Sequence, residues 1–127
     1  MKTAFLIAFS LFANQASAEA PVVVAASAKH HSSGWMIDVT ITHPDTGWDH
    51  FASGWEVIAP DGSVLGYREL AHPHVDEQPF TRSQSGILIP AGATMLTVRA
   101  HDLVDGFGGS EVTIDLNVPE GKDYRIE

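Results

Sequence analysis

Apolar and polar residues alternate along most of the chain after residue 20, and such a two-residue period is typical of β-strands with one buried face. The period is clearest at residues 35–41, 96–100 and 112–118. It is weaker at residues 22–29, 54–59, 63–71 and 80–89. No segment shows the apolar repeat of about 3.6 residues that marks an amphipathic helix. The pattern therefore predicts an all-β protein of about seven strands.

Short turn sequences separate several of these segments, as at residues 32–34 (Ser-Ser-Gly), 60–62 (Pro-Asp-Gly) and 90–92 (Pro-Ala-Gly). Proline fixes one backbone angle and glycine tolerates left-handed angles, so both favour reverse turns. Seven short strands within about a hundred residues are typical of an immunoglobulin-like antiparallel β-sandwich. We therefore predict one domain of this kind over residues 19–118 and a C-terminal tail over residues 119–127.

One stretch of the chain resembles a known family. Residues 86–92 (Gly-Ile-Leu-Ile-Pro-Ala-Gly) followed by residues 96–100 (Leu-Thr-Val-Arg-Ala) are similar to the E and F strands of fibronectin type III domains. Where that family commonly has a corner tyrosine, this chain has Thr94 or Met95. The resemblance implies a two-sheet sandwich and no particular function, because one fold serves many functions.

The N-terminal residues have the composition of a signal peptide. Lys2 precedes an apolar run at residues 4–13, and residues 16–18 (Ala-Ser-Ala) are the small residues that signal peptidase requires. We predict a signal peptide over residues 1–18 and an exported mature protein, periplasmic or secreted, that begins at Glu19. Neither this run nor any later segment is long and apolar enough to predict a membrane span.

The charge balance limits the possible partners. The chain has 16 acidic and 7 basic residues, a formal net charge of −9, and no cluster of Lys or Arg. This pattern argues against nucleic acid and against anionic membranes as partners. The chain also contains no cysteine, which excludes disulfides, thiolate metal ligands and a lipobox cysteine.

Five of the seven histidines fall in three short segments. If successive strands run antiparallel, the connections that hold these segments all lie at one end of the sandwich, whereas His30 and His31 lie at the other. Imidazole and carboxylate groups bind Zn²⁺ or Cu²⁺ without any sulfur ligand. We therefore predict a divalent transition-metal site, Cu or Zn, with the candidate ligands His43, His50, His72, His74, His101 and Asp102.

Local backbone restraints and strand alternation refine this prediction. In residues 72–74 (His-Pro-His) an extended backbone points both rings to the same side, and the proline restrains His72. Alternation places His43 on the inward face, His101 outward and Asp102 inward. The pattern leaves open whether the ring of His101 turns back toward the loops, whether Asp102 is the ligand instead, or whether His101 belongs to the surface.

The same connections carry aromatic residues. Trp48 and Asp49 precede His50, and Phe107 lies in the glycine-containing segment at residues 105–109. Exposed aromatic rings on loops favour a binding surface, and we predict one formed by Trp48, Asp49 and Phe107. The alternative function is an extracytoplasmic protein- or glycan-interaction module that uses these loops without a metal. In a purely structural interpretation the rings close the end of the core.

Catalysis finds little support in the sequence. Ser83 and Ser85 lie in a polar strand segment without the sharp strand-to-helix turn that exposes a hydrolase serine. The glycines around Phe107 lack the helix and lysine of a phosphate loop, and no loop shows the alternating oxygen ligands of a calcium site. The sequence leaves enzymatic activity open without favouring it, and it indicates no organic cofactor.

Overall fold

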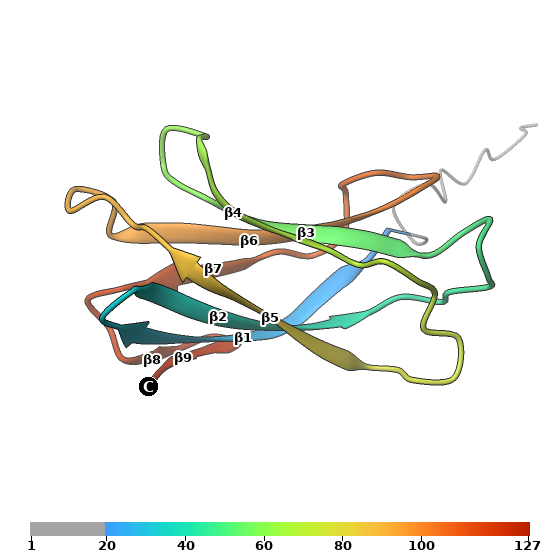
Figure 1. Ribbon diagram of the computed structural model, residues 1–127, viewed down its shortest axis with the longest axis horizontal. Coiled ribbons are helices and arrows are strands. Elements are labelled where there is room, and N and C mark those ends of the chain that lie inside the picture. Colours follow the sequence, from blue (N-terminus) through green and yellow to red (C-terminus); the bar gives the residue numbers. More distant parts are fainter. Residues whose placement is uncertain (1–19) are drawn as a thin grey trace, which may run out of the picture.

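The structure is a computed structural model that describes residues 20–127 and consists of two packed β-sheets (Figure 1). The predicted signal peptide lies outside the described residues. Within residues 20–127 there is no helix, and so none that could cross a membrane. The nine strands are β1 (Val22–His31), β2 (Gly34–Thr42), β3 (Ala52–Ile58), β4 (Val64–Glu69), β5 (Phe80–Ile87), β6 (Met95–Asp102), β7 (Val112–Asp115), β8 (Glu120–Gly121) and β9 (Tyr124–Ile126).

The strands form a five-stranded sheet and a four-stranded sheet. The order in the first is β5-β2-β1-β9-β8, and the order in the second is β4-β3-β6-β7. All neighbouring strands are antiparallel except β1 and β9, which pair in parallel. The chain changes sheets four times, between β2 and β3, β4 and β5, β5 and β6, and β7 and β8. These crossings bring connections from both sheets together at the ends of the sandwich.

The core lies between the inward faces of the two sheets. In β2 the buried residues are Ile37, Val39 and Ile41, and in β6 they alternate in the same way. Trp55 in β3 is completely buried between these strands. Burying a large apolar side chain stabilises the fold by roughly 1.5–3 kcal/mol. The predicted alternation and the all-β class are therefore confirmed.

The C-terminal segment differs from the predicted tail, because residues 119–127 contain β8 and β9. Tyr124 is buried in the core, and its hydroxyl donates to the backbone carbonyls of Asp115 at 3.3 Å and Val118 at 3.0 Å. Strand β9 pairs with β1 through Ala26, Ser27 and Ala28. Strands of two and three residues are too short to show a recognisable alternation, which is why the sequence pattern missed them.

Three connections meet at one end of the sandwich, on the right of Figure 1. They comprise residues 43–51, 70–79 and 103–111. His30 and His31 end β1 at the opposite end, where β1 turns into β2. We call the end formed by the three connections the loop end, because it carries the histidines that the sequence grouped together.

Candidate metal centre

His43 lies at the centre of the loop end, directly after β2 on its inward face. Its Nδ1 atom lies 2.5 Å from Asp45 Oδ1, and its Nε2 atom lies 2.8 Å from Asp102 Oδ2. The side chains of all three residues have no exposed surface. An ionised carboxylate only accepts hydrogen bonds, so the imidazole is held between two buried acceptors.

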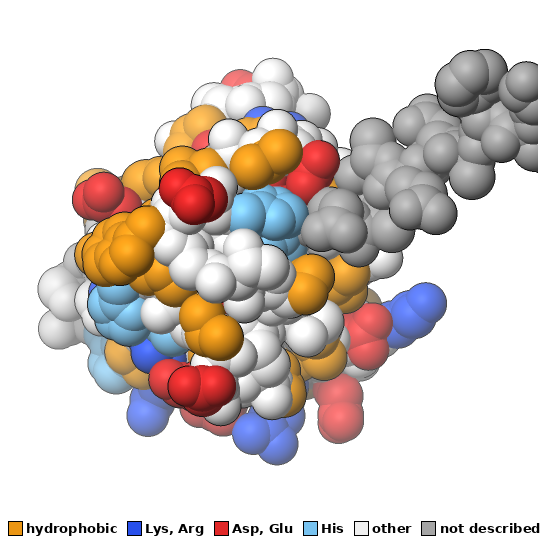
Figure 2. All heavy atoms as spheres, turned by 90° about the vertical axis from the view of Figure 1, so that its right-hand side faces the viewer, with side chains coloured by type: hydrophobic (Ala, Val, Ile, Leu, Met, Phe, Trp, Pro, Cys, Tyr) orange, Lys and Arg blue, Asp and Glu red, His pale blue; other side chains and the backbone are white. Residues whose placement is uncertain are grey.

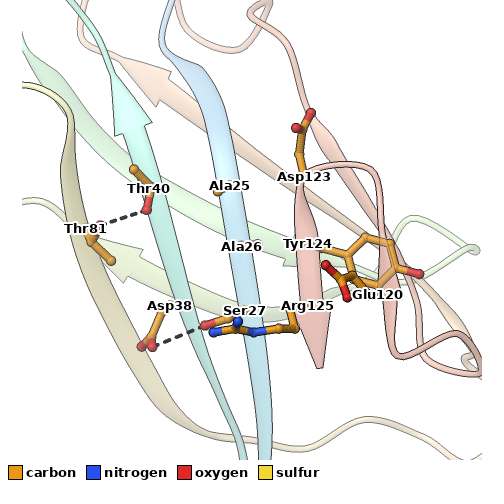
Figure 3. A pocket seen from close by; sticks show the side chains of 10 residues that line it. All are labelled: Ala25, Ala26, Ser27, Asp38, Thr40, Thr81, Glu120, Asp123, Tyr124 and Arg125. Atoms are coloured by element: carbon orange, nitrogen blue, oxygen red, sulfur yellow. Dashed lines mark hydrogen bonds between the residues drawn. The ribbon is translucent and has the colours of Figure 1, made fainter. Parts of the chain in front are cut away.

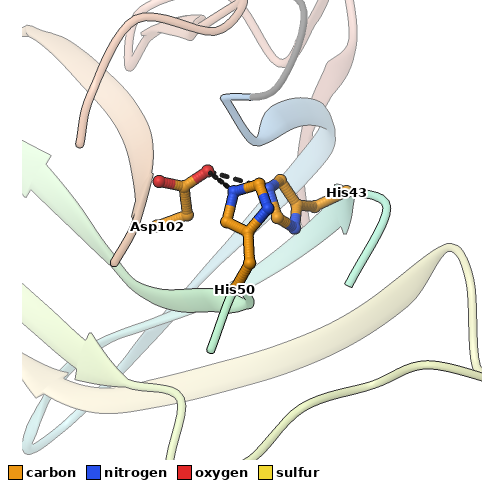
Figure 4. Close-up of side chains that lie close together, drawn as sticks. All are labelled: His43, His50 and Asp102. Atoms are coloured by element: carbon orange, nitrogen blue, oxygen red, sulfur yellow. Dashed lines mark hydrogen bonds and ion pairs between the residues drawn. The ribbon is translucent and has the colours of Figure 1, made fainter. Parts of the chain in front are cut away.

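His50 brings a second imidazole to the same carboxylate oxygen (Figure 4). Its Nε2 atom lies 2.9 Å from Asp102 Oδ2. The ring is edge-on to the ring of His43, with centroids 4.8 Å apart and an interplanar angle of 89°. His43, His50 and Asp102 thus form a group whose potential ligand atoms all lie within 4.8 Å of one another.

Asp102, the last residue of β6, is held rigidly by the connection that follows it. Its Oδ1 atom accepts hydrogen bonds from the backbone N–H groups of Val104 at 2.9 Å, Gly106 at 3.2 Å and Asp105. Burial alone would raise the pKa of Asp102, but these hydrogen bonds and those from the two histidines outweigh it and lower the pKa. The carboxylate is therefore ionised, the form that binds a cation.

Asp105 adds a further carboxylate beside His50. Its Oδ2 atom lies 3.3 Å from His50 Nε2 but is buried without a hydrogen-bond partner. A buried polar atom left without a hydrogen bond costs about 1–3 kcal/mol. An oxygen in this position is available to a cation that enters the group.

Asp45 connects two of the loop-end segments. Its Oδ1 atom accepts from the backbone N–H of Ala52 at 3.0 Å as well as from His43, and its Oδ2 atom accepts from the backbone N–H of His74 at 2.8 Å. The side-chain amide of Gln78 bridges the same segments, since it accepts from His43 N–H at 3.0 Å and donates to the His74 carbonyl at 2.9 Å. The sequence pattern assigned no role to Asp45, although its position two residues after His43 was a usable signal.

His74 lies beside Asp45 rather than beside Asp102, and the ring of His72 lies against that of His74 with centroids 4.5 Å apart. The ring of His74 is buried, stacks on Phe80 at 4.0 Å, and lies with Nδ1 4.0 Å from Asp45 Oδ2. Burial and the nearby Arg82 lower the pKa of His74, so the neutral ring accepts from Arg82 Nη2 at Nε2, 3.0 Å away. His72 is exposed, and its Nδ1 atom lies 3.0 Å from the carbonyl of the next residue.

His101 lies on the outer face of β6, in the direction that strand alternation predicts. Its Nδ1 atom lies 2.8 Å from Ser53 Oγ, and its Nε2 atom lies 3.2 Å from the hydroxyl of Tyr67. Burial lowers the pKa of His101, which favours the neutral ring. Among the sequence-predicted ligands, the structure brings together His43, His50 and Asp102 and keeps His101 outside that group.

The predicted loop-rim residues divide between two surfaces. Trp48 is 68% exposed at the loop end beside the exposed Asp49, and its ring is edge-on to the buried Phe51. Phe107 instead lies against His101, with ring centroids 5.0 Å apart. Figure 2 faces the loop end and shows hydrophobic, acidic and histidine side chains interspersed there.

A groove of about 340 Å³ lies away from the loop end, on the five-stranded sheet (Figure 3). Of the polar side chains in this groove that have a hydrogen-bond partner, most bond to another side chain of the groove. Asp38 accepts hydrogen bonds from Ser27 and Ser83, and the hydroxyls of Thr40 and Thr81 lie 2.7 Å apart. The groove is lined by no histidine, so it does not belong to the metal centre.

Comparison with known proteins identifies a relative from Halomicrobium mukohataei that bears the name "Putative lipoprotein". The two sequences are 44% identical over 77 residues, which is 61% of this chain and 37% of the relative. The chain thus spans well under half the length of that relative. No family model and no solved structure matches the chain.

Proposed function

We propose that this protein is exported and binds a divalent transition metal, Cu²⁺ or Zn²⁺, at the loop end through His43, His50 and Asp102. The observation that carries the proposal is the convergence of two imidazole Nε2 atoms on one ionised oxygen, at 2.8 Å and 2.9 Å. Export is supported by the signal-peptide pattern and by the name of the relative, "Putative lipoprotein".

Two of the three separations between donor atoms suit a transition metal. In a tetrahedral site with bonds of about 2.0–2.2 Å, neighbouring ligand atoms lie about 3.3–3.5 Å apart. The present nitrogen–oxygen separations of 2.8 Å and 2.9 Å require an outward movement of only about half an ångström. A donor set of imidazole nitrogen and carboxylate oxygen is one that both Zn²⁺ and Cu²⁺ accept.

The neighbours of these three residues also fit a metal centre. Metal-binding histidines commonly donate their second ring N–H to a carboxylate, which orients the ring. Asp45 accepts from His43 Nδ1 in this way and leaves Nε2 to face the group. Asp105 Oδ2, which has no hydrogen-bond partner and lies 3.3 Å from His50 Nε2, offers a further ligand. A divalent cation would offset the negative charge of the buried carboxylates of Asp45 and Asp102 and of the partly buried carboxylate of Asp105.

A metal-free interpretation competes with this proposal. In it, His43 only bridges Asp45 and Asp102 and so ties the loops together. Such a bridge does not require His50, which is the more exposed of the two imidazoles, with 16% of its side chain accessible. His50 therefore separates the two interpretations, because its loss removes a ligand and leaves the bridge intact.

Calorimetric titration of metal-free protein, residues 19–127, with Cu²⁺ and Zn²⁺ at neutral pH tests the proposal. We expect one-to-one binding that His50→Ala abolishes and that the matched control His72→Ala retains, because the ring of His72 is exposed and outside the group. Thermal melting of each variant checks the fold. Weak binding at several sites that is the same in His50→Ala would contradict the proposal.

An interaction module at the same loops is the second candidate function. Trp48, Leu103 and Val104 are 68%, 57% and 65% exposed on the connections that carry the cluster. Exposed apolar side chains grouped on loops favour a protein or glycan partner. This function would persist in the presence of a chelator and would be reduced by Trp48→Ala.

The order of the strands in the two sheets supports the prediction of an immunoglobulin-like sandwich. With the first seven strands lettered A, B, C, C′, E, F and G, the two sheets contain E-B-A and C′-C-F-G. In immunoglobulin-like sandwiches, C′ joins the sheet of G, F and C. We infer a fibronectin type III-like arrangement to which β8 and β9 are added.

A further inference from the structure

The outer face of the four-stranded sheet carries a row of rings that crosses from β4 to the connection after β6. Tyr67 and His101 lie parallel, with centroids 5.8 Å apart and an angle of 11°. Phe107 meets His101 edge-on at 5.0 Å, and the guanidinium of Arg99 lies 4.1 Å from the centre of the Phe107 ring. We call Tyr67, His101, Phe107 and Arg99 the aromatic row.

The aromatic row is held in place before any ligand arrives. A Cβ atom on Gly54 in β3 would lie 2.5 Å from the Tyr67 hydroxyl and 2.7 Å from His101 Nε2, so glycine lets both side chains lie directly over the strand. Ser53 hydrogen-bonds the other ring nitrogen of His101. Rings that are already ordered lose little conformational entropy when a ligand binds.

The row presents little net charge to a ligand. The guanidinium of Arg99 is paired with Glu56, with Nε at 2.7 Å and Nη2 at 2.6 Å from the same carboxylate oxygen. The side chain of Glu56 is only 10% exposed, whereas that of Arg99 is 34% exposed. The pair is neutralised, and the exposed Glu69, two residues after Tyr67 on the same face of β4, leaves one carboxylate at the edge of the aromatic row.

The size and charge of the aromatic row indicate its occupant. Tyr67 is 45% and Phe107 40% exposed, which corresponds to an aromatic area on the order of 150–200 Å². A stable protein interface covers about 800 Å² on each partner, so the rings are too small a surface for a protein. The net charge of −9 also disfavours polyanions. A neutral sugar ring, with an apolar C–H face and hydroxyls at its edge, matches both the area and the charge.

We propose that the aromatic row binds a neutral polysaccharide, with one sugar ring stacked on Tyr67 and a second near Phe107. Arg99 and Ser53 supply hydrogen-bonding groups to the sugar hydroxyls at the edge of the row. This site lies on the outer face of the sheet and requires neither the metal centre nor Trp48. Its occupancy can therefore be tested with metal-free protein.

Titration of isotope-labelled metal-free protein with cellohexaose, chitohexaose and mannohexaose, followed by amide NMR signals, tests the proposal. We expect at least one of the three sugars to shift the signals of Gly54, Tyr67 and Phe107 and to bind about tenfold more weakly to Tyr67→Ala, because stacking on the ring is lost. Leu88→Ala is the matched control, since Leu88 is 73% exposed outside the row and its loss should leave affinity unchanged.

Two further variants protect the test against a folding failure. Tyr67→Phe keeps the ring and should bind within about threefold of the wild-type protein. Phe107→Ala removes the other exposed ring from a different element and should weaken binding even if Tyr67→Ala misfolds. Absence of shifts with all three sugars, or shifts confined to Trp48 and its neighbours, would overturn the proposal.

Discussion

Two neighbouring residues at the end of β6 occupy opposite environments. Asp102 points inward, where its carboxylate meets the imidazoles of His43 and His50. His101 points outward, where its ring meets the hydroxyls of Ser53 and Tyr67. The inner histidines have ionised carboxylate neighbours, whereas the outer histidine has neutral hydroxyl and aromatic neighbours.

This difference shows that the neighbours of a histidine decide its chemistry more than its place in the sequence. We call His43, His50, Asp45 and Asp102 the inner cluster. It concentrates buried negative charge, which a cation offsets. The outer ring is kept neutral by partial burial, which lowers the pKa of His101, and it contributes to an uncharged surface. One strand thus separates a group suited to a metal ion from a row of rings suited to a neutral ligand.

The largest predicted effect comes from removing His43, which lies at the centre of the inner cluster. His43→Ala leaves the buried carboxylates of Asp45 and Asp102 without their shared partner, so we expect the free energy of unfolding to fall by about 3–5 kcal/mol. Urea denaturation at neutral pH with a chelator measures it. The matched change is His101→Ala in the outer cluster, which is formed by Ser53, Tyr67 and His101. It should lower the free energy of unfolding by about 1–2 kcal/mol. Equal losses in the two variants would contradict the distinction.

A smaller effect is expected from Asp45→Asn, which keeps the shape of the side chain but removes its charge. Because Asp45 orients His43 through Nδ1, metal affinity should fall about 10–100-fold. Ser53→Ala removes the corresponding partner of the outer histidine and should leave metal affinity unchanged. Calorimetry with Zn²⁺ on both variants gives the comparison, and a loss of affinity in Ser53→Ala would connect the two clusters.

Gly54→Ala disturbs only the outer cluster. The added methyl group would meet Tyr67 and His101 at less than van der Waals distance, so we expect a loss of about 1 kcal/mol as the Tyr67 ring swings away. Thermal unfolding measures this loss. Metal affinity should stay at the wild-type level, since the methyl group points away from the inner cluster. A tenfold loss of metal affinity would show that the substitution also disturbs the inner cluster.

The smallest effect concerns alkaline pH. Burial, together with Glu69 and Glu56, raises the pKa of Tyr67, so between the unfolded value of about 10 and the raised folded value the folded chain holds more protons. The free energy of unfolding therefore falls as pH rises through this window. Tyr67→Phe should remove part of that fall, well under about 1 kcal/mol because the ring is largely exposed. Identical alkaline slopes of stability in the two proteins would rule out this contribution.

Much of the fold could be predicted from the sequence because strand alternation records which residues face the core. The pattern at residues 35–41 and 96–100 located β2 and β6 and gave the correct inward direction for His43 and Asp102. It missed β9, which joins the sheet by parallel pairing with β1. It also assigned no role to Asp45, whose contact with the backbone N–H of His74 joins residues 29 positions apart in the chain.

The sequence by itself determined the strand pattern, the net charge, the absence of thiolate ligands and the end of the sandwich at which the histidines gather. These properties follow from residue type and from the two-residue period of a strand. Only the tertiary structure decided which histidines share a carboxylate, because the chain crosses between the sheets and the distance between its segments is set by core packing. Core packing also decides which partners the two neighbouring residues meet, so that His101 faces Tyr67 while Asp102 faces His43 and His50.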